Sequence, residues 1–133
     1  MAEHAEALLD TSVVIDYTSI PPESLPEQSA IAAITLAELA AGPHAAADEQ
    51  ERVSRQDRLQ WVSATFNPLP FDADAARMYG RIFAATRAAG RSSRARLADL
   101  LIAATAAANG LPLYTRNPSD FVGLEQLVTV VAV

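Results

Sequence analysis

Three acidic residues are placed where they could do chemistry together. Asp10, Glu38 and Asp99 each interrupt a run of apolar residues. A lone carboxylate on a buried face is costly, so three such groups are expected to share a positive charge from outside the chain, most simply a divalent cation. The pattern therefore predicts metal-dependent chemistry.

Two of these acids also have a structural explanation. Asp10 ends an apolar segment just before Thr11 and Ser12, so its carboxylate could instead cap a following helix. Glu38 closes the sequence Thr-Leu-Ala-Glu at residues 35–38, which matches a capping box in which the glutamate reaches back to the capping threonine. From the residues alone, both explanations stay open beside metal binding.

Asp99 is harder to explain by capping. Residues 96–103 are apolar nearly all round, and the predicted helix begins at a cap on Ser92 or Ser93, which places Asp99 beyond its first turn. The remaining structural explanation is a buried ion pair with an arginine, because buried charges are normally paired.

A fourth polar segment follows a short apolar run near the end of the chain. Residues 115–121 read Thr-Arg-Asn-Pro-Ser-Asp-Phe. Asn-Pro and Ser-Asp are ordinary turn formers, and this explains Asn117 well when it is taken singly. Asp120 is a candidate for a fourth carboxylate at the site.

The composition restricts what any metal site can be made of. The chain has no cysteine and two histidines, His4 and His44, which excludes thiolate sites and a histidine-rich zinc centre. Any metal must therefore be held mainly by oxygen.

Charge is unevenly distributed along the chain. The formal net charge is −6, but residues 1–76 hold 13 acids and 3 arginines, whereas residues 77–133 hold 3 acids and 7 arginines. Arginine suits phosphate because its planar fork donates two hydrogen bonds at once. A solvated helix face explains the same stripe. The candidates for holding phosphate groups are Arg91, Arg94, Arg96 and Arg116.

Length and hydropathy predict one soluble domain. The 133 residues, half of them hydrophobic, suffice for a single packed core, and we expect one domain over 1–133 with a flexible N-terminus at 1–6. Glu3 and Glu6 replace the positive charges of a targeting segment, and the longest apolar run, at 100–108, is too short for a membrane span. We therefore expect a cytoplasmic protein.

Strand-like and helix-like segments alternate along the chain. Buried strands are predicted at residues 7–10, 29–34, 67–71, 113–115 and 127–131. Helices are predicted at residues 11–17, 35–42 and 72–89, and from Ser92 or Ser93 to 109, and one amphipathic helix or a pair of helices is predicted at 45–66. This alternation predicts an α/β fold with a central, mainly parallel sheet covered on both faces, whose ligand crevice lies at the carboxyl ends of its strands. Asp10 and the segment after Thr115 fall at such ends.

Four short motifs in this order resemble the PIN-domain ribonucleases, and more closely the VapC-type toxins of type II toxin-antitoxin systems. They lie at residues 8–16, 34–39, 98–106, and 113–117 with 120–121. The resemblance covers essentially the whole chain and implies a PIN-like three-layer α/β/α domain. It implies that Asp10, Glu38 and Asp99 bind Mg²⁺ or Mn²⁺ and that Thr11 or Ser12 orients Asp10.

The last motif departs from the family pattern. Many relatives have an acid where this chain has Asn117. Either Asp120 supplies the missing charge as a further catalytic residue, or the site holds a second metal poorly. Thr115 and Asn117 are expected to support the site.

The resemblance also implies a function and partners. We expect an endoribonuclease that acts as a toxin on RNA of the tRNA or rRNA class, forms a homodimer and is inhibited by a cognate VapB-type antitoxin. The alternative is a catalytically weak or inactive PIN-fold interaction domain. A phosphatase or phosphoacceptor domain fits poorly, because no second aspartate stands two residues after Asp10 and the chain has no lysine.

Overall fold

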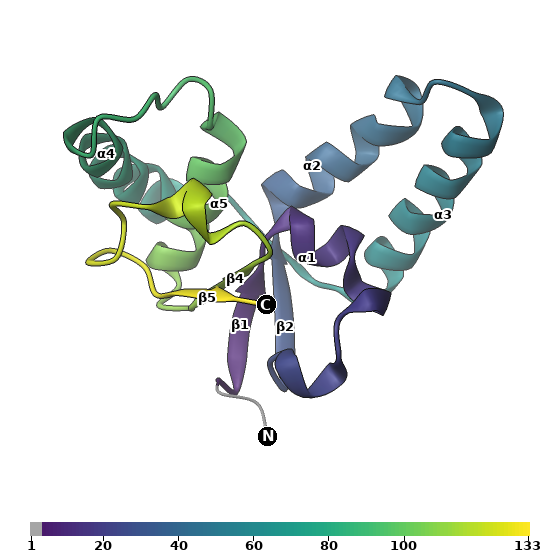
Figure 1. The fold of residues 1–133 in the computed structure, drawn as a ribbon, viewed down its shortest axis with the longest axis horizontal. Helices are drawn as coiled ribbons and strands as arrows, with labels where there is room; N and C mark the ends of the chain where they lie inside the picture. Colours follow the sequence, from purple (N-terminus) through teal and green to yellow (C-terminus); the bar gives the residue numbers. More distant parts are fainter. Residues whose placement is uncertain (1–3) are drawn as a thin grey trace.

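The computed structural model describes residues 4–133 and contains one parallel sheet with helices packed against it (Figure 1). The strands are β1 (Glu6–Leu9), β2 (Gln28–Ala32), β3 (Pro68–Leu69), β4 (Leu113–Thr115) and β5 (Val130–Ala132). The helices are α1 (Thr11–Ile15), α2 (Ala33–Ala41), α3 (Glu49–Thr65), α4 (Ala73–Ala88) and α5 (Leu97–Ala108). The strand order is β3-β2-β1-β4-β5 and every pairing is parallel, which confirms the predicted α/β fold.

The helices form a layer on each face of the sheet (Figure 1). Successive residues of β1 point to opposite faces, as strand geometry requires: Leu8 belongs to one core cluster, and Ala7 and Leu9 belong to the other. The first cluster is completed by residues of α4 and α5, and the second by residues of α1, α2 and α3. The three-layer architecture is therefore confirmed.

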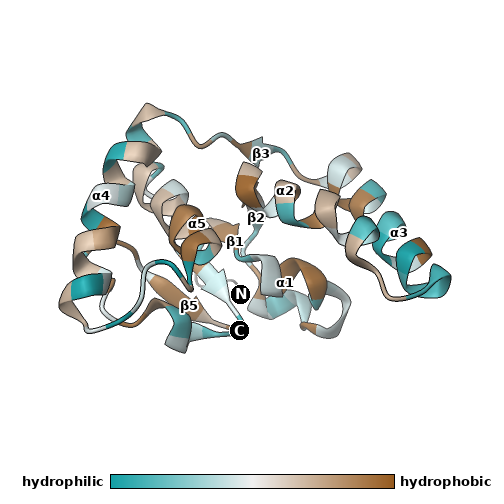
Figure 2. Cartoon of the chain, turned by 90° about the horizontal axis from the view of Figure 1, so that it is seen from above, coloured by the Kyte–Doolittle hydropathy of each residue, from teal (hydrophilic) through white to brown (hydrophobic). Residues whose placement is uncertain are grey.

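The helices α5 and α3, which pack on opposite faces of the sheet, differ in how many of their residues are buried. Six of the twelve residues of α5 are buried, whereas Val62 is the only buried residue in the 17 of α3. Figure 2 shows the same contrast, with α5 mostly brown and α3 mostly teal. An apolar surface all round is what a helix needs when it is enclosed by a sheet and another helix.

No helix within residues 4–133 is long and apolar enough to span a membrane.

Three predicted helix starts are wrong. The helix α2 begins at Ala33, before Thr35, and α5 begins at Leu97, after Ser92 and Ser93. The helix predicted from residue 45 is α3, which begins at Glu49 because Asp48 caps it, its side chain accepting a hydrogen bond from the Glu51 N–H. The delay of α5 has a tertiary cause. Arg91 donates a hydrogen bond to the Ser119 carbonyl, and Arg96 donates to the Asp120 carboxylate at 2.9 Å. Since these contacts hold residues 91–96 to a segment more than 20 residues away, local sequence does not reveal them.

Both ends of the chain also differ from the prediction. Residues 1–3 of the expected flexible segment lie outside the described residues, but Glu6 already pairs with Gln28 in the sheet. The strand predicted from Leu127 begins at Val130, because the backbone N–H groups of Leu127 and Val128 donate to the Leu124 carbonyl in a turn, at 2.9 and 3.0 Å.

Candidate functional site

The carboxyl edge of the sheet brings the predicted acids together from separate elements. Asp10 directly follows β1, and Thr115 is the last residue of β4. Glu38 lies on α2, which follows β2, and Asp99 lies at the start of α5. All the strands are parallel, so these segments leave the sheet at the same edge, which is where ligands bind in such folds.

Asp10 is a buried carboxylate with one oxygen unused. The residue is 3% exposed. Its Oδ2 accepts hydrogen bonds from Ser12 Oγ at 2.9 Å and from Thr115 Oγ1 at 2.8 Å, while Oδ1 is buried without a partner among the described residues. Asp10 occupies the N-cap position of α1, but its side chain makes no capping hydrogen bond. Helix capping therefore does not explain this residue, and Oδ1 remains available to a ligand.

Glu38 is held by a threonine of α1. Thr11 Oγ1 donates to Glu38 Oε1 at 2.7 Å and also shares a hydrogen bond with Thr35 Oγ1 at 2.9 Å. Thr35 lies inside α2, whose N-cap is Ala32, so the capping box considered for Glu38 is absent. Of the two residues expected to orient Asp10, Ser12 contacts it and Thr11 contacts Glu38 instead. Sequence reasoning missed Thr35, whose buried hydroxyl has no signature in the sequence.

Asp99 faces the other acids at the start of α5. Burial is the first cause that raises its pKa, followed by the charges of Asp10, Asp120 and Glu38, and together they bring it from 3.8 to about 6; the charge of Arg96 opposes them. Asp99 lies in the first turn of α5, contrary to the prediction. A helix N-terminus favours a negative charge there, but this does not offset burial and repulsion.

The ion pair considered as the alternative explanation of Asp99 is not formed between described residues. Arg96 pairs with Asp120 Oδ1 at 2.9 Å instead. Asp120 is therefore near enough to Asp99 to raise its pKa but has its own cationic partner. The explanation of Asp99 as a structural ion-pair residue is wrong for this structure.

The remaining predicted residues lie around this edge. The backbone N–H of Asn117 donates to Thr115 Oγ1 at 3.0 Å, and its residue is exposed. Arg116 pairs with Asp16 at 3.4 Å, and its backbone N–H donates to Ser12 Oγ at 3.1 Å. These hydrogen bonds connect the segment after β4 to the hydroxyl groups that hold Asp10.

The carboxylates suit a hard cation that keeps several of its waters, and not one that is enclosed entirely by protein ligands. Among residues 4–133, no three His, Cys, Asp or Glu side chains are grouped closely enough to hold a metal ion together. The three-acid coordination implied by the resemblance is thus not assembled in this structure. However, Mg²⁺ needs only one or two carboxylates because it keeps several waters, and the unpaired Asp10 Oδ1 offers one such ligand.

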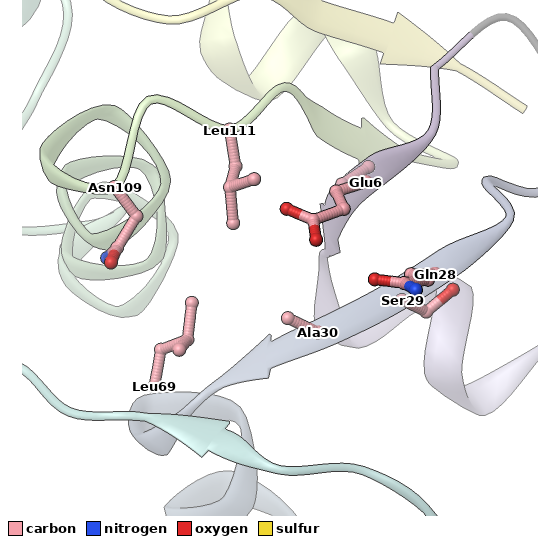
Figure 3. A pocket seen from close by; sticks show the side chains of 8 residues that line it. Glu6, Gln28, Ser29, Ala30, Leu69, Asn109 and Leu111 are labelled. Atoms are coloured by element: carbon pink, nitrogen blue, oxygen red, sulfur yellow. The ribbon is translucent and has the colours of Figure 1, made fainter.

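A separate pocket lies at the opposite edge of the sheet and contains none of these acids. The pocket has a volume of about 300 Å³. Its lining side chains include Glu6, Gln28, Asn109 and Leu111 (Figure 3). Glu6 and Gln28 are the first residues of β1 and β2. The pocket is therefore not the candidate active site.

A comparison with protein families identifies the family to which this parallel α/β fold, with acids at the sheet edge, belongs. The PIN domain family profile matches residues 7–122. The chain therefore belongs to the PIN-domain family, as its fold and motifs predicted.

Named relatives place it more closely within that family. The chain is 40% identical to Ribonuclease VapC5 of Mycobacterium tuberculosis, covering 95% of this chain and 93% of the relative. It is 32% identical to VapC ribonuclease Y4jK of Sinorhizobium fredii, over 86% and 89% of the two chains. A solved VapBC-5 toxin-antitoxin structure from Mycobacterium tuberculosis superposes with a TM-score of 0.80 at 36% identity, covering 97% and 98%. These similarities confirm the resemblance to the VapC type.

Proposed function

We propose that this protein is a metal-dependent endoribonuclease acting as the toxin of a toxin-antitoxin pair. The observation that carries the proposal is the Asp10 carboxylate, which is buried at the sheet edge with Oδ1 unpaired and two hydroxyl groups holding Oδ2. Its VapC relatives are named ribonucleases, which favours RNA as the substrate.

In this proposal the hydroxyl groups position the acids, and the acids provide the negative charge of the site. Ser12 and Thr115 hold Asp10 through Oδ2 and leave Oδ1 without a partner among the described residues, and Thr11 holds Glu38. Burial and the neighbouring acids raise the pKa of Asp99 to about 6, so without a metal its carboxyl group takes a proton at only mildly acidic pH. Together they create a strongly negative site that requires a positive ion before it can accept a phosphate.

Asp10 would bind Mg²⁺ or Mn²⁺ directly through its unpaired Oδ1, and Glu38, Asp99 and Asp120 would contribute through the waters that such an ion keeps. The bound ion supplies a Lewis acid that makes water nucleophilic and offsets charge on the phosphate. By analogy with the family, water adds to phosphorus as the bond to the 3′ oxygen breaks, leaving 5′-phosphate and 3′-hydroxyl ends.

Regulation would come from a protein partner. The VapBC-5 structure is described as a toxin-antitoxin system, and we propose a VapB-type antitoxin for this chain, which could place an arginine beside the acids. We also propose a homodimer acting in the cytoplasm. Size-exclusion chromatography of the chain alone and with its antitoxin tests both associations.

The alternative is an inactive PIN-fold interaction domain. Asn117 favours it, since this residue replaces an acid and is exposed. Its backbone N–H and carbonyl bond to Thr115 and Asp120, but its side chain bonds to no other described residue. This alternative predicts metal binding without cleavage of any RNA.

The deciding experiment combines cleavage and growth. Purified protein is incubated with total bacterial RNA and Mg²⁺ or EDTA, new 5′ ends are mapped, and the chain is induced in a bacterial host. Discrete Mg²⁺-dependent cuts and growth arrest are expected, both lost in Asp10→Ala and Asp99→Asn. Asp74→Asn is the matched control, because Asp74 is also a first-turn aspartate but is 78% exposed. Intact RNA with the wild-type protein, at concentrations where it binds Mg²⁺, would establish the inactive alternative.

A further inference from the structure

We propose that a basic, aromatic pocket beside the acid site binds a single-stranded segment of the RNA substrate. The pocket lies between α4, the loop after it and the start of α5, and has a volume of about 540 Å³. Its main side chains are Tyr79, Phe83, Arg87, Arg91, Arg94 and Leu97. This inference rests on the ribonuclease function proposed above and names how the substrate is held.

One face of α4 supplies the aromatic side of the pocket. Tyr79, Phe83 and Arg87 are spaced by four residues, which places them on the same helix face. The two rings are 6.2 Å apart between centroids, and the Arg87 guanidinium lies 5.8 Å from the centroid of the Phe83 ring. Phe83 is 36% exposed. A partly exposed ring that already stacks with a cation presents a surface on which a nucleobase can stack.

The arginines of the pocket are not neutralised by acids. No Asp or Glu lines it, and none of the ion pairs between described residues includes Arg87, Arg91 or Arg94. By contrast, Arg96 and Arg116, which were also predicted to hold RNA, pair with carboxylates. Three guanidinium groups that form no ion pair with a described carboxylate are complementary to phosphate, even in a chain of net charge −6.

The pocket adjoins the acids through two elements. Leu97, which lines it, is the first residue of α5, and Asp99 lies in the same helical turn. Arg91 donates to the carbonyl of Ser119, the neighbour of Asp120. An RNA strand with its scissile phosphate at Asp99 can therefore continue over the start of α5 into the pocket.

The chemistry favours a single strand over a duplex. The arginines can hold flanking phosphates while a base stacks on Phe83 or Tyr79. In an RNA duplex the bases are stacked on one another, so their faces are not available to these rings. Sequence analysis identified Arg91 and Arg94 but missed Arg87, Tyr79 and Phe83, because their grouping depends on how α4 packs beside the following loop.

The test measures binding without cleavage. Fluorescence anisotropy follows a labelled 12-nucleotide oligouridylate in EDTA, from 50 to 300 mM salt, with the full chain and its variants. Arg87→Gln/Arg94→Gln removes two phosphate contacts and is expected to lower the log-log salt slope by about 1.4 and affinity at 0.1 M salt by about 25-fold. Phe83→Leu is expected to weaken binding about 5-fold or more at an unchanged slope.

The matched control is Arg81→Gln, which removes an exposed arginine from the opposite side of α4. It is expected to leave affinity within about 2-fold, and thermal unfolding verifies that each variant is folded. The proposal is overturned if Arg81→Gln loses as much RNA affinity as the pocket variants, or if the pocket variants bind RNA as the wild-type protein does. It is also overturned if, in a parallel titration with the antitoxin, the pocket variants lose only antitoxin binding. Because the binding assay contains no metal, its result does not depend on cleavage. Pocket-dependent binding in this assay, together with intact RNA in the Mg²⁺ cleavage assay described above, would refute the ribonuclease function alone.

Discussion

Replacing Asp99 with asparagine is expected to stabilise the metal-free protein at neutral pH. Asparagine has nearly the same shape but no charge, so the change removes repulsion by Asp10, Asp120 and Glu38 without opening a cavity. The raised pKa of Asp99, about 6 against an ordinary 3.8, reports how strongly the folded structure disfavours its charge.

The size of the effect follows from that pKa difference. Each pKa unit corresponds to about 1.4 kcal/mol, so the rise from 3.8 to about 6 would cost the folded state about 3 kcal/mol if it were converted in full. Asp99 is only partly buried, so solvent screening reduces this to about half. Loss of the favourable contact between a first-turn carboxylate and the helix N-terminus subtracts a further 0.3–1 kcal/mol, roughly. The expected net gain in unfolding free energy is therefore about 1 kcal/mol.

The pH dependence has a definite sign. Since the folded pKa lies above the unfolded one, the folded state binds more protons between pH 3.8 and about 6. The Asp99 carboxyl therefore costs the fold nothing below this window, and the cost grows as pH rises through it. The advantage of Asp99→Asn should be absent near pH 3.5 and complete at pH 7.5.

Urea unfolding in EDTA, at several pH values across this window, measures the difference. Asp74→Asn is the control, because Asp74 also occupies a first helical turn but pairs with Arg77 at 3.0 Å on the surface. It should lose less than about 1 kcal/mol at pH 7.5. If Asp99→Asn were instead less stable than the wild-type protein at pH 7.5, Asp99 would be a stabilising structural residue and the repulsion argument would be refuted.

Three other changes test the site and the fold. Thr115→Val removes a donor to Asp10 Oδ2 and should lower unfolding free energy by about 1–3 kcal/mol and cleavage by about 10-fold or more, measured by urea unfolding and single-turnover assays. Saturating Mg²⁺ should raise the unfolding temperature of the wild-type protein but not of Asp10→Ala, because a ligand at 100 times its Kd adds about 2.7 kcal/mol. Gly123→Ala should destabilise by about 2 kcal/mol or more, measured calorimetrically, because φ is +96° and the new Cβ lies 2.8 Å from Ala89 Cβ; Gly110→Ala, at φ +64° with open space, should cost less.

The sheet was predictable because its strands are defined by local composition. Residues 7–9 are apolar, and 113–115 are buried on both faces, as parallel strands between two helix layers must be. Helix starts were less predictable. The residues before α5 contain two possible serine caps, but the helix begins later at Leu97 because Arg91 and Arg96 are held by residues 119 and 120.

The acids themselves were identifiable, but their contacts were not. Asp10 stood out as a carboxylate after a buried strand, yet its donor Thr115 is 105 residues away. Glu38 matched a capping box by spacing alone, and only the start of α2 at Ala33 excludes that explanation. Which hydroxyl serves which carboxylate depends on strand order, and four or five residues of local sequence do not encode it.

The position of Arg96 explains how a negative site persists in a folded chain. Arg96 lies three residues before Asp99 in sequence, yet its guanidinium pairs with Asp120. If it neutralised Asp99 instead, the pKa of Asp99 would fall and the site would have less need of a cation. By pairing with Asp120, Arg96 holds the turn at residues 118–121 against the start of α5 and leaves Asp99 facing Asp10. The repulsion that results lowers the stability of the metal-free fold, and the same repulsion is what a cation, or an arginine from a protein partner, would relieve on binding.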